Sequence, residues 1–199
     1  MPELSRRVQT FTDSVIRRMT RINNMTPGSI NLSQGFPDFD PPQEILDALK
    51  EAAEHGPHQY SITFGAKNFR DALAEMYTKK FAREIDPEKE IVVTCGGTEA
   101  MMAAMMTVCN PGDKVAVFSP FYENYGADAI LSGADPVYVP LVPPDFHYDS
   151  EALERAFQAG AKALILCNPS NPCGKVFTME EMEEIAELAK RYDAFVITD

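Results

Sequence analysis

Residues 163–199 read ALILCNPSNPCGKVFTMEEMEEIAELAKRYDAFVITD, and this stretch decides the fold class. The apolar runs at 163–166 and 195–197 have the length and composition of buried strands. Between them, residues 179–192 repeat apolar side chains at helical spacing, and TMEE at 178–181 matches the capping box that begins a helix. Two buried strands joined by a helix form a βαβ unit with parallel strands.

The same alternation continues toward the N-terminus. Further apolar runs of strand length occur at 91–93, 115–118 and 137–139. Helices are expected at 44–55, 67–83, 98–109, 123–131 and 151–158, and in the second of these Phe69, Leu73, Met76, Tyr77 and Phe81 form one apolar stripe.

This order of elements predicts an α/β protein of three layers, in which helices cover both faces of a mostly parallel sheet. The chain stops directly after the apolar run at 195–197. We therefore expect the sheet to be incomplete at the C-terminus.

The composition narrows the class of protein. The 199 residues include 18 Lys and Arg against 30 Asp and Glu, a net charge of −12, which argues against nucleic acid or an anionic membrane surface as the main partner. No run of about 18 apolar residues occurs, and the start, MPELSRRVQTFTDSV, lacks the apolar segment of a signal peptide. We expect a soluble, cytoplasmic protein.

The four cysteines lie mostly in apolar runs, which indicates reduced core thiols. None of the three histidines pairs with a cysteine or carboxylate at a metal-ligand spacing, so no metal site is predicted.

The first candidate site follows the expected strand at 91–93. Gly96, Gly97 and Thr98 would begin the next helix and offer backbone N–H groups, a hydroxyl and the positive end of the helix dipole. A phosphate group binds readily to such a helix terminus. A tight strand-to-helix turn with a threonine cap accounts equally well for the same residues.

The segment SPFYENY at 119–125 follows the next expected strand. Phe121 or Tyr122 there is placed to stack on a flat aromatic ligand, although an aromatic that only covers the sheet edge is the simpler explanation of this segment alone.

Two more polar groups follow expected strands. In NPSNPCGK at 168–175, the Asn171 amide can donate a hydrogen bond to a phenolate oxygen, or the segment is an ordinary Pro/Asn turn. Asp199 needs a cationic partner, such as a ring nitrogen, if it is buried; otherwise it only starts a loop. Because loops at the carboxyl ends of strands meet at one edge, the four segments together predict a pocket for a phosphorylated pyridine.

Four motifs in this order resemble a known family. They are NLSQGFPDF at 31–39, QYSITFG at 59–65, GGTEA at 96–100 and NPSNPCG at 168–174. Over residues 28–199 the chain resembles the N-terminal half of a class I/II aminotransferase that uses pyridoxal 5′-phosphate (PLP), in the kynurenine, aspartate and aromatic aminotransferase branch. The resemblance implies the PLP-dependent transferase fold type I.

The resemblance also implies cofactor contacts. Gly97 and Thr98 would hold the PLP phosphate, and Tyr122 would stack on the pyridine ring, with Phe121 as the alternative if the register is one residue out. Asn171 would donate a hydrogen bond to the phenolic oxygen of the ring.

Three further roles follow from the same resemblance. Asp199 would pair with the pyridine nitrogen and keep it protonated, which makes it a catalytic residue. Gly35 would line the substrate site near the α-carboxylate. Tyr60 would reach the phosphate bound by a neighbouring subunit, which implies a homodimer.

The implied domain organisation places residues 1–39 in a segment that contributes to the small domain and substrate site, and 40–199 in the first part of the large PLP-binding domain. The lysine that binds PLP covalently and the arginine that binds the substrate carboxylate belong to the family's second half. We therefore expect a parent enzyme that moves an amino group from an amino acid to a 2-oxo acid, and an inactive chain when it is isolated. A PLP-dependent C–S β-lyase and a non-catalytic fragment or pseudoenzyme are the alternatives.

Overall fold

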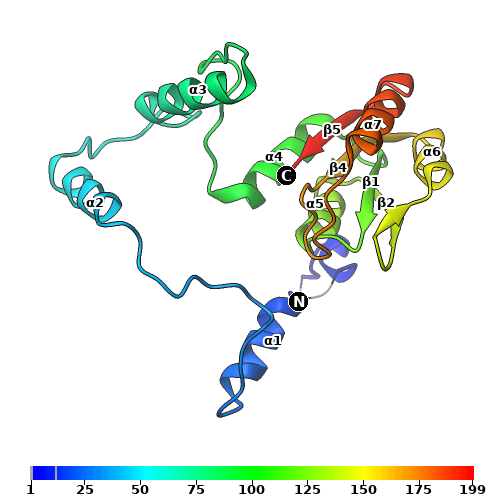
Figure 1. Cartoon of the computed structure of the whole chain (residues 1–199), viewed down its shortest axis with the longest axis horizontal. Coiled ribbons are helices and arrows are strands. Elements are labelled where there is room, and N and C mark those ends of the chain that lie inside the picture. The colour runs from blue at the N-terminus through cyan, green and yellow to red at the C-terminus, as the bar shows by residue number, and fades with distance from the viewer. Residues whose placement is uncertain (1, 12) are drawn as a thin grey trace. The chain divides into compact units, whose positions relative to one another are not determined.

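The computed structural model describes residues 2–11 and 13–199, which form two compact units. Unit 1 comprises residues 2–11 and 95–199, and unit 2 comprises residues 13–94 (Figure 1). The candidate residues from Gly97 onward all belong to unit 1.

A five-stranded sheet forms the centre of unit 1. Its strands lie in the order β3-β2-β1-β4-β5, and every pair is parallel except the short antiparallel pair of β2 with β3. The strands are β1 (Lys114–Ser119), β2 (Asp135–Val142), β3 (His147–Tyr148), β4 (Ala161–Leu166) and β5 (Phe195–Thr198). The strands predicted at 115–118, 137–139, 163–166 and 195–197 are confirmed, and β3 was not predicted.

Helices cover both faces of this sheet, as the alternation of elements predicts. They are α4 (Gly96–Val108), α5 (Asn124–Ser132), α6 (Ser150–Gln158) and α7 (Met179–Arg191), with a short 3-10 helix, η1 (Arg6–Gln9), near the start of the chain. No helix in the described part of the chain is long and apolar enough to cross a membrane.

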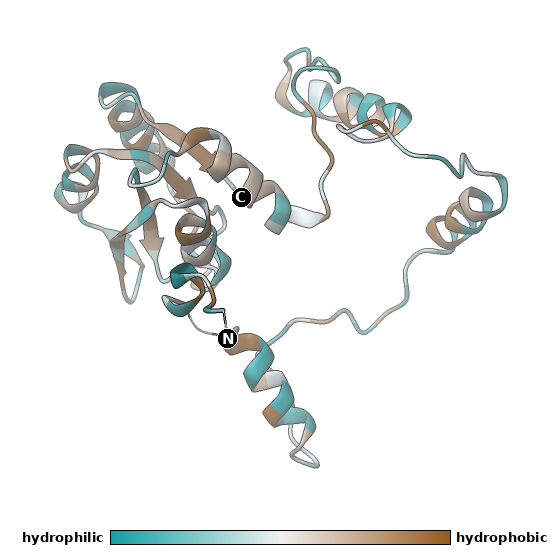
Figure 2. Cartoon of the chain, turned by 180° about the vertical axis from the view of Figure 1, so that it is seen from behind, coloured by the Kyte–Doolittle hydropathy of each residue, from teal (hydrophilic) through white to brown (hydrophobic). Residues whose placement is uncertain are grey.

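Alternate side chains of the strands enter two separate cores. Val115 and Val117 of β1 pack with Met105 of α4, whereas Ala116 and Phe118 pack on the other face, in the core that holds residues of α6 and α7. Successive side chains of a strand point to opposite faces, so strands that are apolar throughout need a helical layer on each side. Most of the sheet is accordingly brown in the hydropathy view (Figure 2). The three-layer prediction is confirmed.

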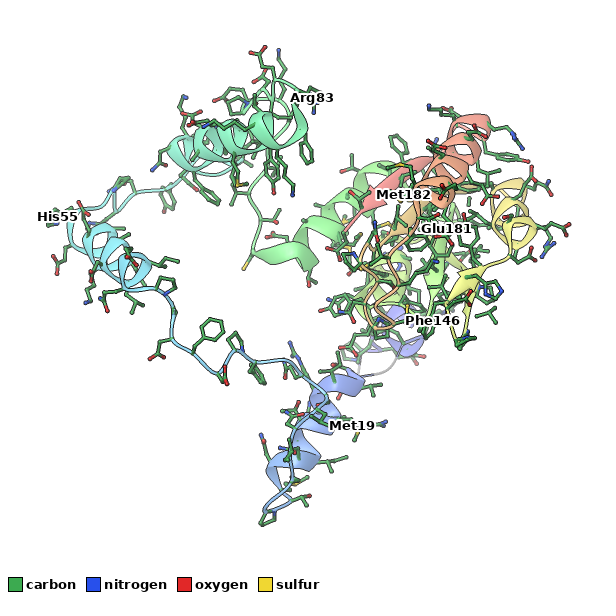
Figure 3. All side chains as sticks on the ribbon, in the orientation of Figure 1. Met19, His55, Arg83, Phe146, Glu181 and Met182 are labelled. Carbon is green, nitrogen blue, oxygen red and sulfur yellow. The ribbon has the colours of Figure 1, made fainter. Side chains whose placement is uncertain are left out.

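The capping box predicted at the start of α7 is also confirmed. The Thr178 hydroxyl accepts a hydrogen bond from the Glu181 backbone at 3.2 Å, and the Glu181 carboxylate accepts one from the Thr178 backbone at 2.8 Å. Lys175 forms an ion pair with the other Glu181 oxygen at 2.8 Å. Glu181, labelled in Figure 3, therefore ties the loop after β4 to the first turn of α7.

Unit 2 contains three helices, α1 (Val15–Asn24), α2 (Gln43–His55) and α3 (Lys67–Phe81). The last two lie where helices were predicted, whereas α1 was not predicted. The predicted strand at 91–93 is wrong, because no strand of the described residues pairs with this segment. Val93 instead donates a single backbone hydrogen bond to Phe64, at 3.0 Å.

The residue after Phe64 must be glycine for this contact to form. Gly65 has a φ of +101°, and a Cβ there would lie 2.5 Å from the Val93 side chain. Both the backbone conformation and the close approach therefore exclude a larger residue.

The apolar stripe predicted for α3 does not form a core in unit 2. Phe69, Met76 and Phe81 are 50%, 49% and 58% exposed, whereas the buried residues of the helix are Arg70 and Ala74. The segment after α3 contacts the helix at Arg70, through the Pro87 carbonyl and the Glu88 carboxylate, and not at the apolar stripe.

The stability of the folded protein should depend on pH, because α5 contains a buried carboxylate. Asp128 is 4% exposed, and its Oδ2 atom has no hydrogen-bond partner among the described residues. Burial raises the pKa of Asp128 from 3.8 to about 6. The folded state therefore holds a proton that the unfolded chain releases, and the free energy of unfolding should fall by about 3 kcal/mol as the pH rises from about 4 to about 6.

Asp128→Asn removes this ionisation while it keeps the size of the side chain. The variant should be more stable than the parent above pH 6, and the difference should shrink toward pH 4. Thermal melting of both proteins across this pH range measures the effect. Melting curves that stay parallel at every pH would contradict the assignment.

Candidate cofactor site

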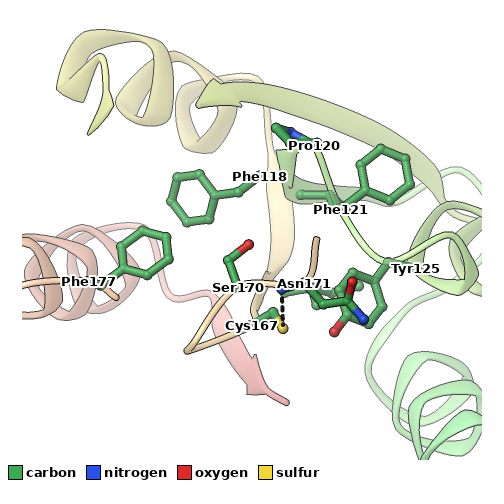
Figure 4. A pocket seen from close by; sticks show the side chains of 10 residues that line it. Phe118, Pro120, Phe121, Tyr125, Cys167, Ser170, Asn171 and Phe177 are labelled. Atoms are coloured by element: carbon green, nitrogen blue, oxygen red, sulfur yellow. Dashed lines mark hydrogen bonds between the residues drawn. The ribbon is translucent and has the colours of Figure 1, made fainter. Parts of the chain in front are cut away.

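A pocket lies at the carboxyl end of β1 and β4 in unit 1 (Figure 4). Loops that follow these two strands supply most of its polar groups, as expected at the edge of a parallel sheet. Its lining residues are Val117, Phe118, Pro120, Phe121, Tyr125, Ile165, Cys167, Ser170, Asn171 and Phe177.

Asp199 lies at the same edge, one residue beyond β5. Its backbone N–H donates to the Leu166 carbonyl at 3.0 Å, and its carbonyl accepts from the Asn168 N–H at 3.1 Å. These bonds extend the pairing of β4 with β5 past the end of the strand. The backbone therefore fixes where the Asp199 carboxylate emerges, independently of the side chain.

Tyr125 of α5 holds this carboxylate. Its hydroxyl donates a hydrogen bond to Asp199 Oδ2, and the residue is 3% exposed. Burial, and secondarily the bond to Asp199, raises the pKa of the Tyr125 phenol well above its usual value. The phenol thus remains a donor at neutral pH, and it orients the carboxylate without neutralising it.

Gly97 and Thr98 lie in the first turn of α4, as predicted for a phosphate site. Their N–H groups are among the first four of the helix, which have no partner within it. A Cβ on Gly97 would meet nothing within 4 Å, so the space beside this backbone is open. The Glu99 carboxylate accepts from the Cys95 N–H, which precedes the helix.

The Thr98 hydroxyl accepts a hydrogen bond from the Asn124 side chain, with 2.9 Å between Nδ2 and Oγ1. Because the threonine oxygen is the acceptor here, its own proton is left to donate to another group. A hydroxyl donor beside a helix N-terminus suits an anion such as a phosphate.

The two aromatic candidates have different surroundings. The Phe121 ring lines the pocket and stacks on Tyr138, with centroids 5.0 Å apart and planes 5° apart. The rings of Tyr122 and Tyr125 form a T-shaped pair with centroids 5.7 Å apart, and the Tyr122 hydroxyl lies 3.4 Å from Asn124 Nδ2. Tyr122 thus contacts Asn124, which bonds Thr98, and Tyr125, which bonds Asp199. One face of the Phe121 ring, in contrast, is already covered by Tyr138.

Asn171 lies in a loop that is closed by hydrogen bonds within its own backbone. Ser170 donates to the Lys175 carbonyl at 2.8 Å and accepts from the Gly174 N–H at 2.7 Å, and the Asn171 N–H donates to Cys167 Sγ at 3.4 Å. Within the described residues, the Asn171 side-chain amide makes no hydrogen bond of its own. It lines the pocket and has its donors available for a ligand.

Five predicted residues therefore lie in unit 1 at this edge: Gly97, Thr98, Tyr122, Asn171 and Asp199. Gly35 and Tyr60 belong to unit 2. Tyr60 is fully exposed there, and a Cβ on Gly35 would meet nothing within 4 Å. Their roles stay predictions.

Sequence reasoning assigned no role to Asn124 or Tyr125, although both lie in the segment 119–125 that it singled out. Asn124 contacts Thr98 and Tyr125 contacts Asp199, so each acts through a residue from another element. No local signal in the sequence pairs them, because Tyr122 precedes α5 and each contact joins residues of different elements.

The donor set at this edge fits one class of ligand. A helix terminus with a free hydroxyl proton suits a phosphate, an aromatic ring suits a flat heterocycle, and a carboxylate held by a neutral phenol suits a cationic ring nitrogen. The fold and the site together define an α/β protein built to bind a phosphorylated pyridine.

Comparisons with known proteins agree. The chain belongs to the class I and II aminotransferase family, whose model matches residues 27–199. It is 38% identical over 195 residues to a probable N-succinyldiaminopimelate aminotransferase DapC of Mycobacterium tuberculosis, covering 97% of this chain and 49% of that protein. It is 34% identical to kynurenine–oxoglutarate transaminase 3 of Rattus norvegicus, covering 98% and 45%.

Solved structures give the same result. N-succinyldiaminopimelate aminotransferase from Mycobacterium tuberculosis superposes with a TM-score of 0.91 at 37% identity, covering 99% of this chain and 52% of that one. The predicted PLP-dependent transferase fold type I is thereby confirmed, and proteins of this family use PLP. The chain spans about half the length of the relatives it matches.

Proposed function

We propose that this chain belongs to a PLP-dependent aminotransferase, which moves an amino group from an amino acid to a 2-oxo acid. The observation that carries the proposal is the set of contacts at one sheet edge: Asn124 with Thr98 and Tyr122, and Tyr125 with Asp199. Family membership supplies the reaction class.

PLP, when bound, supplies an electron sink for the electrons left when the substrate loses its Cα proton. Asp199 holds the proton on the ring nitrogen, because an adjacent negative charge favours the charged form of that nitrogen. Tyr125 keeps the Asp199 carboxylate in one orientation, since its phenol is buried and protonated.

The remaining unit 1 residues orient the cofactor. Gly97 and Thr98 hold the phosphate with N–H and O–H donors, and Tyr122 fixes the plane of the ring. Asn171 donates its amide to the phenolic oxygen. These contacts hold a planar group at three places, which prevents it from turning within the site.

The proposal also includes the oligomeric state, the domain organisation and the cellular location of the enzyme. Tyr60 reaches the phosphate of a neighbouring subunit in a homodimer, and its full exposure within unit 2 agrees with this role. Gly35 lines the substrate site near the α-carboxylate. Residues 1–39 contribute to a small domain, 40–199 to the large PLP-binding domain, and the enzyme is cytoplasmic.

Borohydride reduction tests the proposal on the protein made from its complete reading frame. The protein is incubated with PLP, reduced so that a covalent cofactor link becomes permanent, and weighed intact. One PLP adduct per chain, together with conversion of an amino acid to its 2-oxo acid in the unreduced enzyme, is the expected result.

Other outcomes overturn it in distinguishable ways. An adduct with release of pyruvate and ammonia from a sulfur-containing amino acid, but no transamination, would identify a C–S β-lyase. The absence of both an adduct and turnover would identify a non-catalytic protein.

A further inference from the structure

Asn124 is the first residue of α5, and its side chain contacts the first turn of α4. We propose that Asn124 is a positioning residue, which aligns the Thr98 hydroxyl with the bound phosphate and holds the Tyr122 ring in its stacking orientation. The inference rests on the proposed function, because it concerns the cofactor that the proposed reaction needs.

The geometry gives one amide two acceptors. Asn124 Nδ2 lies 2.9 Å from Thr98 Oγ1 and 3.4 Å from the Tyr122 hydroxyl. A side-chain amide nitrogen carries two protons, so it can donate to both oxygens. The shorter bond joins residues 26 positions apart and is a full hydrogen bond, whereas the longer one is a weaker restraint.

The bond to Thr98 decides where that hydroxyl points. A threonine hydroxyl rotates freely about its C–O bond, so the direction of its proton is set by the groups around it. When Asn124 occupies an Oγ1 lone pair, the hydroxyl proton points away from the amide and is available to the phosphate. A hydroxyl that accepts one hydrogen bond is also polarised by it, which strengthens the hydrogen bond that the hydroxyl donates.

The contact with Tyr122 gives the same amide a second effect. The Tyr122 ring is restrained by its T-shaped contact with Tyr125 and at its hydroxyl by Asn124. One side chain thus fixes both the group expected to bind the phosphate and the ring expected to stack on the pyridine. Loss of the amide should loosen the cofactor at two points.

The affinity for PLP measures this role without any turnover. The complete protein is freed of cofactor, and the Kd for PLP is determined by equilibrium dialysis for the parent, Asn124→Ala and Asn124→Asp. We expect Asn124→Ala to raise the Kd about tenfold. Asn124→Asp should raise it at least as much, because a carboxylate would accept the Thr98 proton and repel the phosphate.

Asn124→Asp separates positioning from a structural role. An acidic residue in the first turn of a helix stabilises that helix, so the melting temperature of this variant should be equal to or above that of the parent. A weaker Kd with an undiminished melting temperature is the expected combination. Asn110→Ala is the matched control, since Asn110 bonds Asp113 in the turn before β1, at the other end of that strand.

A double-mutant cycle with Thr98→Ala tests the route of the effect. If Asn124 acts through Thr98, Asn124→Ala should cost much less affinity in the Thr98→Ala background than in the parent. Additive losses, or an unchanged Kd in both Asn124 variants, would overturn the inference while PLP binding by the parent protein stands. A parent protein that binds no PLP would instead overturn the proposed function itself.

Discussion

Replacing Asp199 by alanine should lower the rate of transamination by the complete enzyme about a thousandfold or more. The carboxylate is expected to keep the pyridine nitrogen protonated, and without that charge the electrons left on the substrate Cα lose their sink. The fold should survive, because the two backbone bonds that Asp199 makes to Leu166 and Asn168 do not use its side chain.

Two further variants separate charge from position. Asp199→Asn keeps the shape and an oxygen for the Tyr125 hydroxyl, but it removes the charge, so its loss should approach that of alanine. Tyr125→Phe keeps the charge and removes only the bond that orients it, and its loss should be about tenfold. Single-turnover rates with PLP-saturated protein provide the comparison. An Asp199→Asn enzyme with the parent rate would contradict the assignment.

The layered fold of unit 1 was accessible from sequence because its signals are local. Strands β1, β2, β4 and β5 are apolar runs, and α7 carries its own capping box at Thr178 and Glu181. Their existence depends on hydrophobic period and caps, which neighbouring residues supply.

The predictions that failed concern elements that are defined by strand pairing or by packing against other segments. Residues 91–93 are apolar like a strand, yet no strand of the described residues pairs with them, so the pattern alone misled. The two residues of β3 are a strand only because they pair with Leu141 and Val142 of β2. In α3, the apolar stripe indicated the helix correctly, but the buried face is that of Arg70.

The residues of the candidate site also fall into two groups: those that the sequence located and those that only the folded structure brings together. Tyr122, Asn171 and Asp199 each follow a strand that the sequence predicted, so their position in the chain indicated their place in the fold. Gly97 was indicated only by the glycines at the start of a helix, because the strand predicted before it is wrong. The supporting groups act across distance: Asn124 bonds a residue 26 positions away, and Tyr125 bonds one 74 positions away. A single sequence does not pair such residues, and only the folded arrangement shows that they support the predicted ligands.

The largest stability effect is expected in unit 2, from Arg70→Ala. The Arg70 side chain is completely buried, and its guanidinium donates to the Gly65 carbonyl at 3.1 Å, to the Pro87 carbonyl, and to the Glu88 carboxylate at 3.1 Å. Truncation would leave these acceptors without their donor and a cavity in their midst. We expect a loss of about 3–5 kcal/mol in the stability of this unit.

Hydrogen exchange of the α3 amides is the appropriate measurement, because it reports opening of unit 2 whether or not unit 1 remains folded. Lys67→Ala is the control on the same helix, since Lys67 forms an exposed ion pair with Asp71 and its loss should cost less than about 1 kcal/mol. Arg70→Lys should recover little, because an ammonium cannot reach three acceptors placed for a planar fork. Equal exchange in the Arg70→Ala and Lys67→Ala proteins would show that the buried guanidinium does not hold α3 to the segment at 84–93.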